Sequence, residues 1–358
     1  MILILDSFFT GSHKYWGEQL QKRLPFDVEL LTLSGRFWKW RMEGGAIELA
    51  KKFKKLKKKP SLIIATDMVN IPLFYAHASI TKEKTPCIMY FHENQFSYPL
   101  SEKDTDKKMN RDNHYGFINL SSAIYADNLV FNSDFNRKSF MKGCEKLIKK
   151  LPSSFLKKEL EKIKSQIIYP GIENNSYLTN QNKKPKNKVI LWNHRWEHDK
   201  NPELFIKGLE HLQSKKINFK LIVTGKGSET SKIQDLIRLK FPNELIHCGY
   251  CESREDYYKL LIQSTHLPVT SKHDFFGISV AEAMDLGCFA ILPNHQAYPE
   301  HFTKNEESSV LYNFPHGFFE ALEKSLYSKK NVKTKEEFYW EAVINKWVKQ
   351  IEAILQAH

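Results

Sequence analysis

The chain has 358 residues, of which 41% are hydrophobic, and its formal net charge is +13. This length suits two ordinary domains or one large domain, and the charge favours a polyanionic partner such as nucleic acid, an acidic membrane surface or a phosphorylated substrate. A basic protein without such a partner is the alternative. Five cysteines and the lack of a long apolar segment argue against a secreted or membrane-spanning chain, so we expect a reduced, cytoplasmic protein without membrane insertion.

Apolar runs alternate with helical segments through the first half of the chain. This alternation predicts an α/β domain with a mostly parallel sheet. The predicted strands cover residues 2–5, 28–33, 62–65, 87–91, 129–132 and 166–169.

The first strand leads into the segment DSFFTGSHKYW. Gly11 permits a close backbone approach, and Ser12 can cap the helix that follows. Such a loop often borders a ligand cleft, although an ordinary strand-to-helix turn explains it equally well. The segment lacks a complete G-x-G-x-x-G pattern, so it gives little support to dinucleotide binding.

A lysine-rich stretch follows the second strand. Ile47, Ala50, Phe53 and Leu56 recur every three residues, which predicts a helix over 46–58 with an apolar stripe and a cationic outer face. This face could contact phosphates or could simply be solvated. The predicted phosphate contacts are Lys51, Lys52, Lys54, Lys55, Lys57, Lys58 and Lys59.

Polar residues also follow the fourth strand. His92 lies at the carboxyl end of this strand, where ligand-facing residues emerge in parallel sheets. A lone histidine is more often structural than catalytic. Glu93, Asn94 and Gln95 share the same loop, however, and a polar cluster of this kind has no role in an apolar core. These residues are therefore candidates for ligand binding.

Two short patterns have the spacing of metal sites. The D-T-D pattern at 104–106 lies in a charged loop without a preceding strand, so we interpret it as a solvent-exposed loop. Cys248 and Cys251 have C-x-x-C spacing beside His247, but a single pair cannot complete a tetrahedral zinc site. We therefore predict no metal site.

The second half of the chain begins after a polar segment, residues 174–188, that we predict to be a linker. A new strand starts at Val189, and Arg195 and Lys200 lie in the loop between it and the next helix. The guanidinium fork and the flexible ammonium group both suit phosphate oxygens. Alternatively, Asp199 could pair with either cation and give it a structural role.

Residues 266–293 read as strand, tight loop, helix and strand. The loop at the carboxyl end of such a strand is where ligands bind, and the amides of Gly277 and Ile278 at the helix start favour an anion. Asp274 and Glu282 are eight residues apart, so both can face one small polar ligand. The alternative is an aspartate that caps an ordinary amphipathic helix.

The pattern of Asp274, Phe275, Phe276, Gly277 and Glu282 resembles the E-x7-E signature of retaining, nucleotide-sugar-dependent glycosyltransferases of family 4, with aspartate in place of the usual first glutamate. The resemblance implies the GT-B fold, an α/β architecture in which two Rossmann-like domains with parallel sheets face an interdomain cleft. It also implies that the C-terminal helix crosses back to the N-terminal domain. We accordingly predict domains at 1–173 and 189–334 and a terminal helix within 335–358.

This resemblance also implies roles for individual residues. The first acid would hold sugar hydroxyls, Glu282 the ribose, and Arg195 with Lys200 the diphosphate, while His92 would contact the donor sugar. The implied catalytic residues are His92, Arg195, Lys200 and Asp274. The implied donor site comprises Arg195, Lys200, Gly225, Tyr250, Asp274, Phe275, Phe276, Gly277, Ile278 and Glu282. The implied acceptor side comprises Gly11, Ser12, His13, His92, Glu93, Asn94, Gln95, Asn132 and Ser133.

At finer grain, the segments FFTGSHK, FWKWR, YFHENQFSYP, FNSDFN, NHRWEHDKNPE and KHDFFG resemble glycosyltransferases that mannosylate queuosine in tRNA. This implies GDP-mannose as donor, no cofactor, and queuosine at the wobble position of a tRNA, with tRNA-Asp as the expected acceptor. Two alternatives stay open. One is a glycosyltransferase of lipid or polysaccharide at a membrane face, and the other is a non-catalytic tRNA-binding protein of the same fold.

Overall fold

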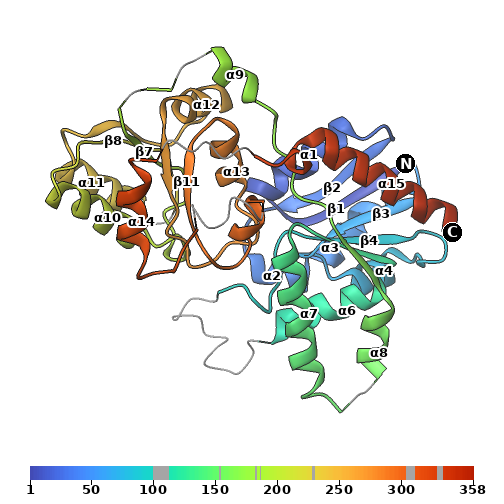
Figure 1. Cartoon of the computed structure of the whole chain (residues 1–358). Coiled ribbons are helices and arrows are strands. Elements are labelled where there is room, and N and C mark those ends of the chain that lie inside the picture. Colours follow the sequence, from blue (N-terminus) through green and yellow to red (C-terminus); the bar gives the residue numbers. More distant parts are fainter. Residues whose placement is uncertain are drawn as a thin grey trace. The chain divides into compact units, whose positions relative to one another are not determined.

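The computed structural model of the chain describes residues 1–99, 113–152, 155–181, 184–185, 187–227, 230–303, 311–328 and 334–358. The chain divides into two compact units (Figure 1). Unit 1 comprises Met1–Gly171 together with Glu341–His358, and unit 2 comprises Ile172–Trp340. The final helix therefore contributes to the unit built by the first half of the chain. The D-T-D pattern at 104–106 lies outside the described residues.

Unit 1 is built on a six-stranded sheet with the order β2-β1-β3-β4-β5-β6, in which every neighbouring pair is parallel. Its two central strands, β3 and β4, are buried along their whole length, as expected for apolar runs covered by helices on both faces. The strands are β1 (Ile2–Phe9), β2 (Val28–Ser34), β3 (Leu62–Thr66), β4 (Cys87–Phe91), β5 (Asn128–Phe131) and β6 (Lys164–Ile167). The sixth strand begins two residues earlier than predicted.

The described helices of unit 1 cover this sheet. They are α1 (Gly11–Arg23), α2 (Trp38–Glu43), α3 (Gly45–Phe53), α4 (Ile71–Ala78), α6 (His114–Tyr125), α7 (Asp134–Ile148), α8 (Phe155–Lys162) and α15 (Trp340–Ala357). Helices α1 and α15 lie side by side (Figure 1), with the rings of Trp16 and Trp347 6.0 Å apart. Val343, Trp347 and Ile351 recur at helical spacing along α15 and are buried, so this helix has an apolar face.

The lysine-rich helix is shorter than predicted. Helix α3 ends at Phe53, so most of the lysines follow it rather than decorate its outer face. The buried positions are Gly45, Ala46, Leu49, Ala50 and Phe53, which follow the helical period more closely than the predicted three-residue spacing. Successive lysines at helical spacing repel one another, which disfavours continuing the helix beyond this point.

Unit 2 contains a second six-stranded sheet, with the order β12-β11-β10-β7-β8-β9 and parallel neighbours throughout. The predicted α/β class with parallel sheets is thus confirmed for both units. The strands are β7 (Val189–Trp192), β8 (Lys220–Val223), β9 (Leu245–Cys248), β10 (His266–Pro268), β11 (Phe289–Pro293) and β12 (Leu311–Tyr312). The helical segments are α9 (Ser176–Gln181), η1 (His198–Lys200), α10 (Pro202–Ser214), α11 (Thr230–Lys240), α12 (Arg254–Gln263), α13 (Ile278–Asp285), η2 (Tyr298–His301), α14 (Phe318–Ser325) and η4 (Glu336–Phe338).

The segment predicted as a linker is part of unit 2. Helix α9 forms within it, and the Lys184 ammonium donates to the carbonyl of Leu261, 2.9 Å away, and to that of Ser264. Both carbonyls lie at the end of α12, where helix carbonyls lack intrahelical donors. Hydrogen bonds between a lysine and a helix end far away in the chain leave no periodic pattern in the sequence, so the sequence did not predict them.

None of the helices within the described ranges has the length and apolar character that crossing a membrane requires.

Candidate active site

Two loops of unit 2 lie where the strand order of its sheet reverses. The order reverses between β10 and β7, and in open parallel sheets ligands bind outside the carboxyl ends of the strands at such a switch point. The loop after β7 carries Arg195 and Lys200, and the loop after β10 carries Asp274. The fold therefore brings together residues that are more than seventy positions apart.

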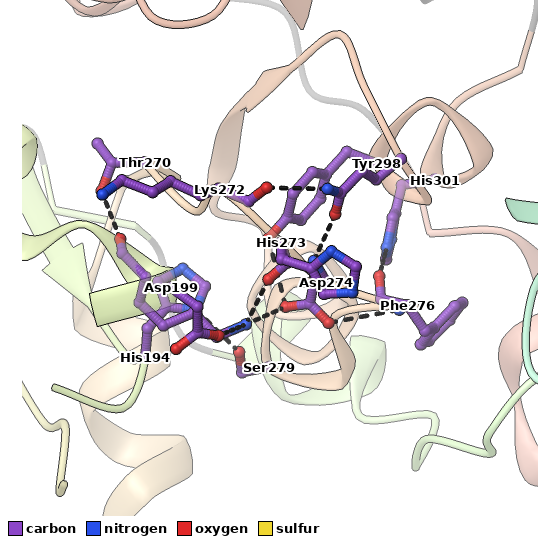
Figure 2. Close-up of polar contacts among 12 residues, drawn as sticks. His194, Asp199, Thr270, Lys272, His273, Asp274, Phe276, Ser279, Tyr298 and His301 are labelled. Atoms are coloured by element: carbon purple, nitrogen blue, oxygen red, sulfur yellow. Dashed lines mark hydrogen bonds and ion pairs between the residues drawn. The ribbon is translucent and has the colours of Figure 1, made fainter. Parts of the chain in front are cut away.

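A buried ion pair joins these two loops (Figure 2). The Lys200 ammonium lies 2.9 Å from an Asp274 carboxylate oxygen and 2.9 Å from the His273 carbonyl oxygen. An Asp199 oxygen is 3.3 Å away. Burial alone would raise the pKa of Asp274, but Lys200 outweighs it and holds this pKa well below its usual range. Asp274 is therefore ionised at neutral pH.

The pair changes the interpretation of Lys200. The sequence predicted that Lys200 would bind a diphosphate, yet its ammonium is committed to His273, Asp274 and Asp199. The pairing with Asp199 is the alternative that the sequence left open. The contacts support a role for Lys200 in fixing the carboxylate of Asp274.

The loop that carries Asp274 has a fixed shape. The Tyr298 hydroxyl donates to the Asp274 carboxylate at 3.3 Å, and the Gln296 side chain accepts the Asp274 amide at 2.6 Å (Figure 2). Gly277 follows with a φ of +91°, a conformation that only glycine adopts without strain, and it precedes the first residue of α13. Phe276 is buried, and its carbonyl accepts a hydrogen bond from His301. Phe276 and its hydrogen bond to His301 thus anchor the start of α13 to the interior of unit 2.

A cavity of about 430 Å³ lies at the loop after β7 and reaches α13, but none of the described residues that line it belongs to the loop that carries Asp274. Arg195 and Glu282 both line it, as do Gly225 and Tyr250, so four of the predicted donor-site residues share one hollow. A side chain at position 225 would place its Cβ 2.1 Å from the His194 carbonyl oxygen, so glycine is required there. A cavity of this size, lined by polar groups, suits a ligand as large as a nucleotide.

Glu282 is held at the cavity by residues that the sequence did not single out. The buried carboxylate contacts the guanidinium of Arg254 at 2.5 Å. Burial raises the pKa of Glu282, and Arg254 and the Tyr257 hydroxyl partly offset this rise. Asn193 donates to Tyr257 at 3.0 Å and thereby joins β7 to α12. Arg254 follows the cap residue of a helix, a position with no distinctive pattern, so only the tertiary structure reveals it.

A second polar cluster lies in unit 1, where the strand order reverses between β1 and β3. His13 Nδ1 lies 2.9 Å from an Asp6 carboxylate oxygen, and the rings of His13 and His92 stack with centroids 3.9 Å apart. The His92 amide donates to Asp67 at 2.8 Å. The ring of His92 also contacts Trp16, so α1 supports both histidines.

The two histidines differ in charge. Burial tends to lower the pKa of His13, but Asp6 reverses this effect and raises the pKa to about 9. Burial and the neighbouring His13 cation lower the pKa of His92 well below 6.5. The pair is therefore one imidazolium stacked on one neutral imidazole. His92 Nε2 is buried and has no hydrogen-bond partner within the part of the chain that the structure describes.

Asp6, His13 and His92 also offer ligand atoms within 4.8 Å of one another, as a metal site would. However, His13 Nδ1 is bonded to Asp6, and two stacked rings direct their nitrogen atoms along similar planes rather than toward one point. This arrangement suits a charge-paired histidine dyad better than a metal site.

The remaining predicted acceptor-side residues fall into two groups. Asn94 and Asn132 bond to Asn136 at 2.8 Å each, and Ser133 caps α7, so these side chains have structural partners. Glu93 accepts from Gln95 at 2.9 Å beside the histidine pair.

The predicted capping role of Ser12 is wrong. Helix α1 begins at Gly11, two residues earlier than such a cap would require, and Gly11 has a φ of +51°. The residue in the cap position is Thr10, and its side chain makes no capping hydrogen bond.

The seven lysines of the predicted phosphate-binding face are all exposed. Lys52 donates to the Thr32 carbonyl at 2.9 Å, and Lys58 pairs with Asp27 at 3.0 Å. The ammonium group of Lys59 lies 5.1 Å from the ring centroid of Phe53.

We expect the substitution Lys200→Met to destabilise the protein by about 3–5 kcal/mol, because it leaves a buried carboxylate without its cation. Adding Asp274→Leu should recover part of this loss, and urea unfolding of the two single variants and the double variant measures the coupling. Lys272→Met, at an exposed position in the same loop, serves as the control and should change stability by less than about 0.5 kcal/mol. Strictly additive losses would contradict the pairing.

We expect Asp6→Asn to alter how stability depends on pH. Because the folded-state pKa of His13 is raised from 6.5 to about 9, the pair stabilises the protein fully below pH 6.5 and loses this contribution as pH rises through 9. The difference in unfolding free energy between wild type and Asp6→Asn should therefore be larger at pH 6.5 than at pH 9.5. Asp27→Asn, at a largely exposed position, is the control. A difference that stays constant with pH would refute the charged state assigned to His13.

Comparison with known proteins provides independent evidence for both halves of the chain. A family model described as tRNA-queuosine alpha-mannosyltransferase N-terminal matches residues 1–172, and one described as glycosyl transferases group 1 matches residues 175–337. A curated relative from Drosophila melanogaster, named tRNA-queuosine alpha-mannosyltransferase, is 30% identical over 335 residues, covering 87% of this chain and 86% of the relative.

Solved structures show the same fold at low sequence identity. Sucrose-phosphate synthase from Thermosynechococcus elongatus aligns with a TM-score of 0.70 at 14% identity over 100% of both chains. Anabaena HepE in complex with UDP aligns with a TM-score of 0.67 at 15% identity over 98% of this chain and 99% of that chain. These likenesses establish the GT-B fold. The two family models and the curated relative show that the chain is a glycosyltransferase and belongs to the tRNA-queuosine alpha-mannosyltransferase family.

Proposed function

We propose that this enzyme transfers mannose from GDP-mannose to queuosine at the wobble position of a tRNA, with tRNA-Asp as the acceptor. The observation that carries this proposal is the match of residues 1–172 to a family model specific to such enzymes, supported by a curated relative that is similar over most of its length. The net charge of +13 favours a polyanionic acceptor. Such a substrate implies that the enzyme acts in the cytoplasm.

The cavity of unit 2 supports a role in holding the donor. Arg195 and Glu282 line the same hollow, where the guanidinium suits a diphosphate and the carboxylate suits ribose hydroxyls. Lys200 acts mainly through Asp274, whose ionised carboxylate would accept hydrogen bonds from sugar hydroxyls. The helix start at Gly277 and Ile278 would offer free amides to the same ligand.

The proposed mechanism of sugar transfer depends on where negative charge develops during the reaction. As the bond between sugar and diphosphate breaks, negative charge grows on the leaving phosphate, and a cation aimed at it lowers the barrier. Arg195 would supply this charge. The leaving phosphate would assist deprotonation of the acceptor hydroxyl on the same face of the sugar, so that configuration is retained. This scheme involves no metal ion.

The histidine pair of unit 1 suits recognition of a hydroxyl group. His92 is neutral, and its Nε2 is buried without a partner within the described residues, so a substrate hydroxyl could satisfy it. The His13 imidazolium beside it provides positive charge next to the predicted acceptor loop at Gly11. We assign His92 to substrate contact and His13 to the acceptor side on these grounds.

The decisive experiment is to incubate queuosine-containing tRNA with several nucleotide sugars and to analyse the nucleosides by mass. We expect a hexose addition to queuosine with GDP-mannose only. Arg195→Ala should reduce the rate on the order of a hundredfold or more, because it removes stabilisation of the leaving group. Product from another sugar donor would reject the assigned donor. Intact tRNA affinity without any product would indicate a binding protein instead of an enzyme.

The lysine-rich segment provides a second test. We expect the triple variant Lys54→Glu, Lys55→Glu and Lys57→Glu to bind tRNA more weakly and to show a flatter dependence of log affinity on log salt. Each lost phosphate contact should reduce the slope by roughly 0.7–0.9. All three side chains are exposed, so the melting temperature should change little. An unchanged slope would show that the tRNA binds to a different surface.

A further inference from the structure

Two large aromatic side chains of unit 1 that are three positions apart in the sequence are exposed. Phe37 is 79% exposed and Trp40 is 53% exposed, although residues of this size normally contribute to cores or interfaces. Both belong to the short segment around α2, in the sequence GRFWKWR. The lysine and histidine contacts described above do not involve these rings.

The indole ring of Trp40 is held in one orientation. Its Nε1 donates to a Glu48 carboxylate oxygen at 3.1 Å. A Cβ atom built on Gly44 would lie 2.5 Å from the Trp40 ring, so the ring rests against the backbone at that position. One side of the indole is therefore supported by the protein, and more than half of the side chain remains accessible to solvent.

The same acid fixes the neighbouring guanidinium. Glu48 accepts two hydrogen bonds from Arg41, at 3.0 and 3.1 Å, and Arg41 also donates to the Ser34 carbonyl at 3.3 Å. These contacts connect α2 to α3 and to the end of β2. The two exposed aromatic side chains thus project from a segment that these hydrogen bonds hold in place.

The base of the segment is anchored by Trp38. This side chain packs with Met42 and Tyr115, and its ring centroid is 5.0 Å from that of Tyr115. Phe37, immediately before it, has a φ of +57°, a left-handed conformation that is unfavourable for an aromatic residue. Such strain persists only where the surrounding contacts impose it, and it is concentrated at functional positions.

Cationic residues flank the exposed rings in the sequence. Arg36, Lys39 and Arg41 lie within the segment itself. Helix α3, which supplies Glu48, continues to the exposed Lys51 and Lys52. Aromatic faces interleaved with cations are the typical surface for single-stranded nucleic acid, because bases stack on the rings while cations neutralise the phosphates. The charge argues against an apolar partner.

The segment also adjoins the predicted acceptor loop. A Cβ atom on Gly35 would lie 2.3 Å from the side chain of Thr10, the residue that precedes Gly11. Phe8 packs in the same cluster as Trp38, and its ring centroid is 6.2 Å from that of His13. Packed side chains therefore link the histidine pair to Trp38, which lies between the two exposed aromatic residues in the sequence.

We propose that Phe37 and Trp40 form a stacking platform for unpaired bases of the RNA acceptor, with Arg36 and Lys39 contacting the adjoining phosphates. The proposal rests on the proposed function, because it takes the acceptor to be tRNA. It adds the surface that recognises the unpaired loop. Bases of an RNA duplex are stacked on each other and cannot use such a platform.

The test measures the affinity of the full-length protein for two RNAs at one salt concentration: the anticodon stem-loop and a fully paired duplex of equal length. Phe37→Ala and Trp40→Ala should each weaken stem-loop binding by about 5- to 150-fold, and both should leave duplex binding unchanged. Trp40→Phe should recover most of the affinity, since a smaller ring still stacks. The salt dependence should keep its slope, because stacking releases no counterions.

Phe155→Ala provides the matched control. Phe155 is 61% exposed on α8 and has Lys157 and Lys158 nearby in sequence. We expect this variant to bind both RNAs as the wild type does. Gly44→Ala supplies a second approach, because the added methyl group would displace the Trp40 ring without removing it and should reproduce the loss for the stem-loop. Melting temperatures of all variants verify that they fold.

The outcomes separate the platform from the proposed function. Unchanged stem-loop affinity of both alanine variants would overturn the platform, and so would an equal loss for stem-loop and duplex. If mannose transfer by the wild type were intact in that case, the proposed function would stand alone. A wild type that binds neither RNA would overturn both. A change in oligomeric state with unaltered RNA affinity would assign the rings to contact between copies of the chain and would also reject the platform.

Discussion

The buried pair of Lys200 and Asp274 fixes the arrangement on which the candidate donor site of unit 2 depends. It joins the loop after β7 to the loop after β10 at the point where the strand order reverses. An ammonium group and a carboxylate removed from water must remain together, since either one alone would be costly to bury. The pair thereby sets the position of the loop from which α13 begins and brings Glu282 to the cavity that Arg195 also lines.

Unit 1 uses buried charge in a related way. Asp6 stabilises the protonated form of His13, and burial together with the resulting cation lowers the pKa of the stacked His92 and keeps it neutral. The rings around them extend this support, because Trp347 of the last helix contacts both Trp16 and Tyr90, which in turn contact His92. The C-terminal helix thus contributes to the setting of the histidine pair as well as to the core of unit 1.

The segment around α2 is the surface of unit 1 that we propose for contact with an RNA acceptor. Glu48 orients both the Trp40 indole and the Arg41 guanidinium, so a single acid positions an exposed ring beside a cation. Preorganisation of this kind lowers the entropy lost on binding. The exposed lysines after α3 offer charge that suits general attraction to phosphate rather than recognition of individual bases.

The sequence by itself determined the two parallel sheets, the approximate ends of most strands, and the family, because these follow from local hydrophobic patterns and from motifs within single loops. It also identified Asp274, Glu282, Arg195 and His92 as candidates. Only the tertiary structure decided that Lys200 is committed to Asp274, that Arg254 and Tyr257 hold Glu282, and that Lys184 ties the predicted linker to α12. These pairings join residues far apart in the chain, and the free energy of a buried charge depends on what surrounds it in space, which local patterns do not record.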